Sequence, residues 1–440
     1  MRVESNLSHF YLSRIDDNVQ SIIIITKKTL SHHSTHSAVH CGAGYHSNAN
    51  SKTFENIMKQ ALYHTRNQYF TNQYETNSIQ HCLSACSYCI SILENSPFTN
   101  AGFGSNLNRE GRVECDACLC YSDTHHSKLY ASCGAIFGVY NPILMCHQMI
   151  LDIISNSSGI YSSCQLIKPL FLCGRGTLEY IKLNNINGLL YCNLENELHD
   201  YMITEKSRIE FNKYRNILNN TSSGIRSDNT NNNIVNPNNT SSSTLYDTVG
   251  AIVYYNGVLC SCVSSGGILL KYPGRIGEAA IYGSGCSSES VVVESLSDQS
   301  DEEMDELRNR SDKNPSHSLI QLANNFSGIG EDIMFNQMSN HLNYQILELD
   351  KTMEQSFNSL FSLNSLFGMK ERKIGCMSCK VYDGCELEFG YAFSTESMGI
   401  GYTHSNDSSY CVEIKRLNHC LDSSSSSSSS SSIQVIPIKF

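Results

Sequence analysis

The chain has 440 residues, enough to bury a substantial core in one large domain or in two. Its formal net charge of −11 argues against a nucleic-acid-binding protein, which normally carries a basic face. The apolar run Ile22 to Ile25 is far too short to span a bilayer, so we expect no membrane partner.

The N-terminal stretch 1–20 contains acidic residues and no continuous apolar segment, so we expect no secretory signal peptide. The 20 cysteines are then expected to be free thiols in a reducing compartment, many of them acting as small core residues. These observations predict a protein of the nucleus, the cytoplasm or both. Residues 1–37 show no pattern that assigns them to the main domain, and we treat them as an N-terminal extension.

Residues 53–94 predict two amphipathic helices separated by a polar turn near 72–77. In the second helix Cys82, Cys86 and Cys89 recur at i, i+4 and i+7. That spacing occurs in iron–sulfur radical enzymes, and it is also the spacing of a stripe that faces a core. We favour the buried stripe, because a cluster needs a loop to splay its thiolates and no Gly or Pro is present.

A glycine turn follows in SPFTNAGFGSNLN (96–108), where Asn100 and Asn106 are either turn residues or amides of a site. Two segments then repeat a strand followed by a helix. They are residues 131–150 and residues 168–182.

The most informative stretch is YDTVGAIVYYNGVLCSCVSSGGILLKYPGR, residues 246–275. Asn256-Gly257 lies between two β-prone runs, which is a strong signal for a two-residue hairpin turn. The register that this turn sets places Thr248 opposite Ser265, with side chains in contact distance. The pair is either an ordinary cross-strand contact or a pair of catalytic hydroxyls at the open end of the hairpin.

The segment before the hairpin favours the catalytic interpretation. Residues 217–246 are almost entirely Asn, Ser and Thr, which predicts a flexible arm leading to Asp247. A cut between Asp247 and Thr248 would give Thr248 a free amine beside its own hydroxyl. Since the reference pKa of an α-amine is about 7.7–8.0, that amine could act as the base. Arg275, in the turn that follows, could bind a substrate carboxylate.

The rest of the chain predicts further elements of the same domain. Residues 297–317 form an acidic insertion, and residues 423–432 form a serine linker. Ser327-Gly328 is predicted to open a helix that runs to about Leu349, either as a simple cap or with N–H groups aimed at an oxyanion. Residues 386–402 predict two strands. Alternating strands and helices around a central hairpin favour a layered α+β domain.

These segments together carry a family resemblance. The chain resembles the threonine aspartases (taspase), within the asparaginase-type N-terminal nucleophile (Ntn) hydrolases. The matching segments, in family order, are VHCGAGYHS (39–47), SPFTNAGFGSNLN (96–108), VECDA (113–117), DTVGA (247–251), SSGG (264–267), KYPGRIG (271–277), SGIGED (327–332) and STESMGIGY (394–402).

The resemblance implies a single-domain, four-layer αββα Ntn-hydrolase sandwich. It implies self-cleavage into an α subunit, residues 38–247, and a β subunit, residues 248–440, that stay together. Two such precursors are expected to form a homodimer, (αβ)2 after cleavage. No cofactor or metal is required for the chemistry, although some relatives hold a structural sodium ion.

The resemblance also implies roles for single residues. Thr248 is the nucleophile, Ser265 is the second hydroxyl, and Arg275 binds a substrate carboxylate. Ser327 and Gly328 form the opposite side of the substrate pocket, and Asn100 lies close to Thr248.

We therefore expect a threonine endopeptidase that cuts protein substrates after aspartate. Glu278 is similar to the amine-binding carboxylate of the asparaginases, which supports a second hypothesis: an L-asparaginase or isoaspartyl peptidase acting on small substrates. A third hypothesis is an uncleaved, inactive binding protein.

Overall fold

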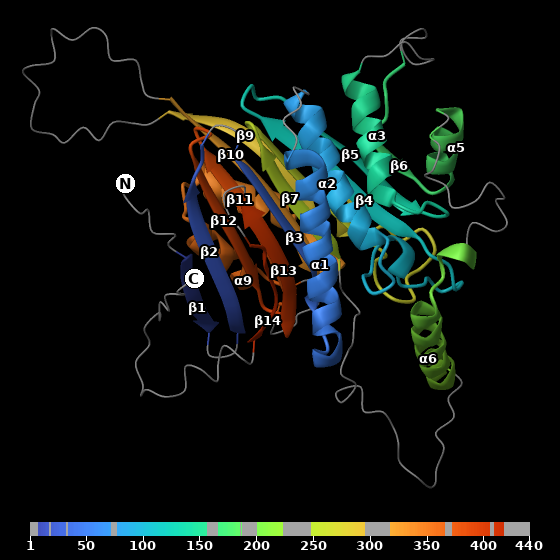
Figure 1. The fold of residues 1–440 in the computed structure, drawn as a ribbon. Helices are drawn as coiled ribbons and strands as arrows, with labels where there is room; N and C mark the ends of the chain where they lie inside the picture. The colour runs from blue at the N-terminus through green and yellow to red at the C-terminus, as the bar shows by residue number, and fades with distance from the viewer. Residues whose placement is uncertain are drawn as a thin grey trace, which may run out of the picture.

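Two β-sheets form the centre of the structure, a computed structural model of the chain (Figure 1). The structure describes residues 8–16, 19–31, 34–71, 77–155, 166–184, 186, 200–222, 248–294, 317–365, 372–404 and 409–417. In this part of the chain no helix is long and apolar enough to cross a membrane. The expected mixture of helices and sheets, an α+β chain, is confirmed.

The first sheet, sheet A, has the strand order β1-β2-β12-β11-β10-β9, with all neighbours antiparallel. The second, sheet B, has the order β14-β13-β3-β7-β8-β4-β5-β6, in which only the β5–β6 pair is parallel among the described strands. The strands of sheet A are β1 (Ser8–Asp16), β2 (Val19–Thr29), β9 (Cys286–Glu294), β10 (His317–Gly328), β11 (Ile374–Tyr382) and β12 (Glu386–Phe393). Those of sheet B are β3 (Thr35–Gly44), β4 (Cys115–Asp123), β5 (Lys128–Ile136), β6 (Phe171–Cys173), β7 (Val249–Tyr255), β8 (Val258–Ser265), β13 (Ser397–His404) and β14 (Cys411–Arg416).

Different helices pack against each sheet. Helices α1, α2 and α3 lie on sheet B, with α2 on β7 and β8 and α3 on β4 and β5 (Figure 1). Helices α8 and α9 pack on sheet A, against β10 and β2. The helices are α1 (Ser51–Thr65), α2 (Ser78–Glu94), α3 (Pro142–Ile154), α5 (Arg175–Leu183), α6 (Glu205–Ser222), α7 (Gly330–Phe335), α8 (Met338–Asn343) and α9 (Met353–Ser362).

The apolar run in β2 shows why sheet A is buried on both faces. Side chains alternate along a strand, so neighbours in the run point to opposite faces. Ile22 and Ile24 belong to a core cluster with residues of sheet B, such as Ile252. Ile23 and Ile25 belong to another cluster, with residues of α8 and α9. Continuous Ile is therefore what this strand requires, and the N-terminal extension expected over 1–37 contributes β1, β2 and the start of β3 to the sheets.

The central hairpin has the predicted register. Val249 pairs with Ser264 and Tyr255 with Val258. Asn256 and Gly257 both have positive φ, 47° and 80°, which is the requirement of the tight turn that matches strand twist.

Two other predictions about local structure are confirmed. The cysteine stripe of α2 is buried, and the Cys82 thiol donates to the Val253 carbonyl at 3.4 Å. Residues 386–402 form two strands as predicted, and the polar residues 394–396 separate β12 from β13.

Two predicted elements differ from the structure. Ser327 and Gly328 end strand β10 instead of opening a helix, and the expected helix to Leu349 is broken into α7, α8 and a π-helical turn, Tyr344–Glu348. The break falls at Gln337, whose φ of 44° is left-handed. The flexible arm was expected from 217, but α6 continues through Ser222. Asp247, the rest of that arm and the serine linker lie outside the described residues, as does the acidic insertion apart from the His317 backbone.

Candidate active site

Thr248 lies immediately before β7, at the open end of the central hairpin. Its side chain is buried, and its Oγ1 lies 3.2 Å from Ser265 Oγ at the end of β8. Ser265 Oγ also accepts the N–H of Gly267 at 3.0 Å, which fixes the orientation of the hydroxyl. The hairpin thus brings the two predicted hydroxyls together.

A carboxylate lies on the other side of the Thr248 hydroxyl. Glu278, at the start of a short 3-10 helix (Glu278–Ala280), places Oε1 2.6 Å from Thr248 Oγ1. The Glu278 side chain is almost fully buried, and burial raises the pKa of its carboxyl. The charge of Arg275 and the hydrogen bond with Thr248 act in the opposite direction, toward a lower pKa.

Ser327, at the end of β10, holds the backbone of Thr248. Its Oγ accepts the N–H of Thr248 at 3.2 Å and the N–H of Ala43 at 3.0 Å. Ser327 therefore joins sheet A to β3 and β7 of sheet B at the site. Gly328 allows the backbone at Lys373 to lie close to β10, because a Cβ on Gly328 would lie 2.4 Å from the Lys373 carbonyl oxygen.

Arg275 is held by a carboxylate from α7. Its Nε and Nη2 lie 3.0 Å and 2.8 Å from Glu331 Oε1. Its Nη1 is buried and makes no hydrogen bond within the described residues. The guanidinium lies near Glu278, since a Cβ on Gly330 would meet both Glu278 Oε2, at 2.2 Å, and Arg275 Nη2, at 2.9 Å. This arrangement can receive a substrate carboxylate next to the hydroxyl pair.

Asn100 supports the glycine turn that follows Ser265. Its Nδ2 donates to the Gly267 carbonyl at 2.9 Å, and its backbone carbonyl accepts the Gly266 N–H at 2.8 Å. Asn106 donates to the same Gly267 carbonyl at 3.0 Å, and its own N–H donates to Asn100 Oδ1 at 2.9 Å. Asn100 and Asn106 were predicted to be either turn residues or amides of a site. Their contacts favour the first interpretation, because both amides hold the turn beside the site.

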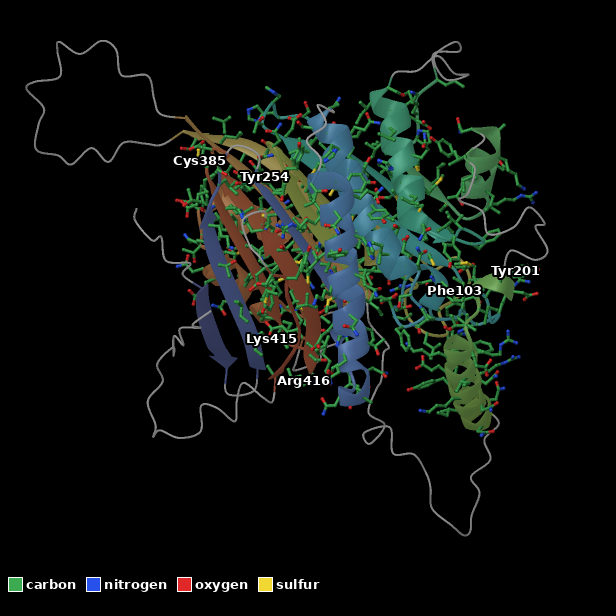
Figure 2. The ribbon with its side chains drawn as sticks, in the orientation of Figure 1. Phe103, Tyr201, Tyr254, Cys385, Lys415 and Arg416 are labelled. Carbon is green, nitrogen blue, oxygen red and sulfur yellow. The ribbon has the colours of Figure 1, made fainter. Side chains whose placement is uncertain are left out.

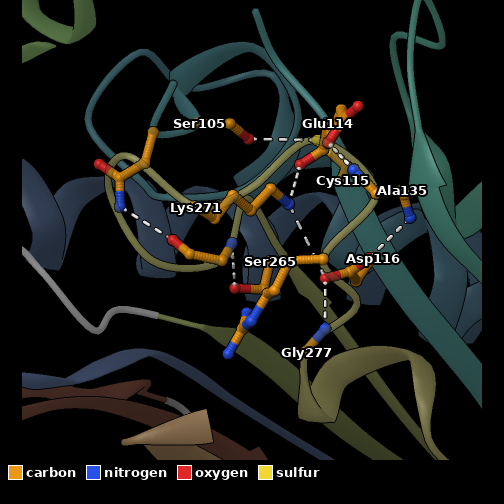
Figure 3. Close-up of polar contacts among 12 residues, drawn as sticks. Ser105, Glu114, Cys115, Asp116, Ala135, Ser265, Lys271 and Gly277 are labelled. Atoms are coloured by element: carbon orange, nitrogen blue, oxygen red, sulfur yellow. Dashed lines mark hydrogen bonds and ion pairs between the residues drawn. The ribbon is translucent and has the colours of Figure 1, made fainter. Parts of the chain in front are cut away.

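A buried ion pair beneath the Arg275 turn was not predicted (Figure 3). Lys271 Nζ donates to the Glu114 carbonyl at 2.6 Å and lies 4.0 Å from Asp116 Oδ2, with both side chains inaccessible to solvent. The Asp116 carboxylate also accepts the N–H groups of Gly277, at 2.9 Å, and of Ala135, at 2.8 Å. The signal in the sequence was the carboxylate of Asp116 within a run of apolar and cysteine residues, 115–120.

His40 is a second residue that sequence reasoning missed. It faces Gly250 across β3 and β7, and a Cβ on Gly250 would lie 2.2 Å from its Nε2. Burial lowers the pKa of His40 to about 3, against the effects of Asn325 and the Thr248 backbone, so its ring is neutral at pH 7. A histidine before the Gly-x-Gly of β3 was the available signal.

The described residues offer no group of three or more His, Cys, Asp or Glu side chains that could hold a metal ion. The cysteines among them form no disulfide bonds. Burial raises the pKa of Cys89 to about 12, which fits an inert core thiol rather than a ligand.

Comparisons with known proteins find relatives named plant-type L-asparaginases. The chain is similar to the plant-type L-asparaginases of Pyrococcus horikoshii, 25% identical over 216 residues, and Thermococcus kodakarensis, 26% identical over 215 residues. A third relative, from Pyrococcus furiosus, is 26% identical over 211 residues. Each alignment covers 48% of this chain and 58% of the relative, so the chain spans little more than half the length of these relatives.

The match to a family model is shorter and lies on the site itself. It covers residues 190–295, which include Thr248, Ser265, Arg275 and Glu278. Over this segment the chain matches the family described as asparaginase.

Proposed function

We propose that the chain is a self-processing threonine hydrolase that acts on aspartyl or asparaginyl substrates. The observation that carries the proposal is the surroundings of Thr248. Its hydroxyl lies between Ser265 Oγ and Glu278 Oε1, while its N–H is held by Ser327 Oγ. A threonine placed in this way can attack a carbonyl carbon, with a second hydroxyl to stabilise the transition state.

Cleavage between Asp247 and Thr248, which we propose as the activating step, would release the amine of Thr248. Because the reference pKa of an α-amine is about 7.7–8.0, part of it is free base at neutral pH and can accept the hydroxyl proton. Thr248 then forms an ester with the substrate acyl group, while the C–N bond of the substrate breaks and the leaving ammonia or amine takes the proton. Water hydrolyses that ester and restores the Thr248 hydroxyl. The products after cleavage would be residues 1–247, which contain the predicted α subunit (38–247), and residues 248–440, the predicted β subunit.

The fold supports this proposal. Two packed sheets, with α1–α3 on one and α8–α9 on the other, fit the four-layer sandwich expected for an Ntn hydrolase. The paired precursors, (αβ)2 after cleavage, and a nuclear or cytoplasmic location stay predictions from the sequence.

We propose that Arg275 binds the substrate carboxylate. Its Nη1 lies buried with no hydrogen bond among the described residues, while Glu331 holds the other side of the guanidinium. A buried donor without an acceptor is costly, and a bound carboxylate would supply the acceptor. Substrates with a carboxylate next to the reacting carbonyl are therefore favoured.

A small substrate is the first candidate, as in an L-asparaginase or isoaspartyl peptidase. Glu278 supports it, because a buried carboxylate beside Arg275 can pair with the ammonium of a free amino acid while Arg275 pairs with its carboxylate. The relatives found by comparison are also named L-asparaginases.

An endopeptidase that cuts proteins after aspartate is the second candidate. It is favoured by the resemblance to the threonine aspartases, which rests on an ordered set of segments, among them SPFTNAGFGSNLN (96–108) and STESMGIGY (394–402). In this case Arg275 would bind the aspartate side chain of a protein substrate, and Glu278 would have no ammonium to pair with.

The test of activity is a side-by-side assay of free L-asparagine and of a peptide with an internal aspartate. If the small-substrate candidate holds, asparagine is hydrolysed, and Glu278→Gln, assayed per molecule of cut chain, has a strongly lowered kcat/KM for it. If the endopeptidase candidate holds, only the peptide is cut, and replacing its aspartate by asparagine costs roughly 10² to 10⁴ in kcat/KM. A chain that stays whole on a denaturing gel and turns over neither substrate would support the inactive binding protein instead.

A further inference from the structure

The self-cleavage proposed above needs a base that the mature enzyme does not need. In the uncut chain the nitrogen of Thr248 is an amide, bonded to residue 247, and its N–H donates to Ser327 Oγ. An amide nitrogen does not accept the hydroxyl proton. The amine that serves as base after cleavage is therefore missing during the first cut, and the inference below rests on that proposed cut.

Two polar groups contact the Thr248 hydroxyl within the described residues. Ser265 Oγ lies 3.2 Å away and Glu278 Oε1 lies 2.6 Å away. A neutral serine hydroxyl holds an added proton poorly, whereas a carboxylate holds it readily. Asn325 and the Thr248 backbone act on the pKa of His40, and among the described residues neither ring nitrogen has a hydrogen-bond partner in the Thr248 hydroxyl.

We infer that Glu278 is the general base that starts self-cleavage of the precursor. Glu278 takes the hydroxyl proton while Thr248 Oγ1 bonds to the carbonyl carbon of residue 247. The C–N bond between residues 247 and 248 then breaks, and Glu278 returns the proton to the leaving nitrogen, which becomes the amine of Thr248. Water hydrolyses the remaining ester, which gives the carboxylate of residue 247 and restores the Thr248 hydroxyl.

The surroundings of Glu278 suit this role. Burial and the charge of Asp116 raise the pKa of the Glu278 carboxyl, while Arg275 and the Thr248 hydroxyl lower it. The remaining charged groups nearby are already paired, Lys271 with Asp116 and Glu331 with Arg275. A carboxylate with a raised pKa is a stronger base once ionised, and the charge of Arg275 and the hydrogen bond with Thr248 favour the ionised form that accepts the proton.

The geometry also keeps this carboxylate in place through the reaction. A Cβ on Gly330 would lie 2.2 Å from Glu278 Oε2, so the glycine leaves the space that the second carboxylate oxygen occupies. The inference holds for either substrate candidate, because it concerns the chain's own peptide bond. After cleavage the same carboxylate is free to pair with an ammonium.

The experiment follows the precursor as it is made. Full-length chain is produced by cell-free translation, transferred to buffers from pH 5 to pH 9, and sampled on denaturing gels. The cut converts 440 residues into pieces of 247 and 193 residues, the second being 440 minus 247. Thr248→Ala is the uncut control. Glu289→Gln in β9, which removes a carboxylate paired with Lys128 of β5, is the matched control that keeps the wild-type rate.

The wild-type rate should rise with pH as Glu278 ionises and then become constant. Glu278→Gln should be roughly 10² to 10⁴ slower, as expected for loss of a positioned base, and its residual rate should lose that pH dependence. Glu278→Asp, which keeps a carboxylate on a shorter stem, should recover part of the rate with a displaced pH profile. If Glu278 had only a structural role, Glu278→Asp would not displace the pH profile of self-cleavage.

The opposite results are equally clear. Glu278→Gln that cuts itself at the wild-type rate overturns the inference and leaves the proposed function standing. A wild-type chain that is never cut overturns both. Folding is checked by the thermal unfolding of Thr248→Ala with and without Glu278→Gln. If the Gln variant does not fold, Glu278→Asp decides: self-cleavage at the wild-type rate with an unchanged pH profile overturns the inference.

Discussion

Ser327 Oγ accepts the backbone N–H of Thr248 at 3.2 Å, across the interface between the two sheets. The same oxygen accepts the Ala43 N–H at 3.0 Å, so one hydroxyl from sheet A satisfies two buried donors of sheet B. Its position fixes the amide at which the proposed cut occurs. Stability and self-cleavage are therefore coupled at this residue.

Ser327→Ala should lower both properties. It leaves the N–H groups of Thr248 and Ala43 without this acceptor, which costs on the order of 1–3 kcal/mol for a buried group. Urea unfolding in the uncut Thr248→Ala background measures the stability, and the gel assay measures self-cleavage. The matched control is Ser378→Ala on β11, whose hydroxyl donates to Asn324 Oδ1 at 2.6 Å away from the site. Equal self-cleavage in the two variants would contradict a role for Ser327 at Thr248.

Ser265 and its neighbour Ser264 provide a second comparison. Alternation along β8 sends Ser265 Oγ to Thr248 and Ser264 Oγ to Glu94 Oε1, at 2.7 Å on the other face. Ser265→Ala should slow self-cleavage and turnover by about 10² to 10³, the usual cost of a positioned hydrogen-bonding group. Ser264→Ala should cost stability and leave both rates near wild type. Wild-type rates in Ser265→Ala would mean that the pair is an ordinary cross-strand contact.

These two serines also show what the sequence could predict. The pairing of Thr248 with Ser265 follows from a two-residue turn and a period of two, both of which are local properties. Glu278 was singled out by resemblance alone, and nothing local indicated that its carboxylate contacts the nucleophile. Ser327 was assigned to a helix start, but it ends a strand of the opposite sheet.

The unpredicted parts depend on how distant segments come together. The sequence around Lys271 is that of an ordinary surface lysine, and only the fold shows that Asp116 of β4 lies beneath it. Gly330 begins helix α7, and nothing in its own segment indicates that η5, the Glu278–Ala280 turn, lies against it. Long-range pairing of this kind leaves no periodic signal in either segment.

Glu94 should make stability depend on pH. Burial raises the pKa of its carboxyl from 4.5 to about 8, with Ser264 and the Ile143 N–H opposing that rise. Between pH 4.5 and 8 the folded protein keeps a proton that the unfolded chain releases, so the free energy of unfolding falls as pH rises through this window. Below it both states are protonated and the loss is absent.

The measurement is urea unfolding of the Thr248→Ala chain from pH 5 to pH 9. Glu94→Gln should remove much of the decline, matching its parent at pH 5 and exceeding its stability at pH 8 by several kcal/mol. His36 and His40 act in the opposite direction up to about pH 6.5. Burial lowers the pKa of each from 6.5 to about 3, so below pH 6.5 the unfolded chain takes up protons that the folded protein does not. The comparison of Glu94→Gln with its parent at each pH removes this shared contribution. A difference in stability between Glu94→Gln and its parent that is constant from pH 5 to pH 8 would show that Glu94 is ionised in the folded state.

Gly330→Ala separates the geometry of the site from the stability of the fold. The added Cβ would lie 2.2 Å from Glu278 Oε2 and 2.9 Å from Arg275 Nη2, so the ends of these side chains must move. Ala is a better helix former than Gly at this first position of α7, which offsets part of the strain. We expect self-cleavage to slow by at least tenfold and KM to rise, with the unfolding midpoint little changed. Gly176→Ala in α5, where a Cβ meets nothing within 4 Å, is the control that should keep the wild-type rate of self-cleavage and the wild-type KM. Wild-type self-cleavage in Gly330→Ala would show that neither Glu278 nor Arg275 needs its present position for the cut.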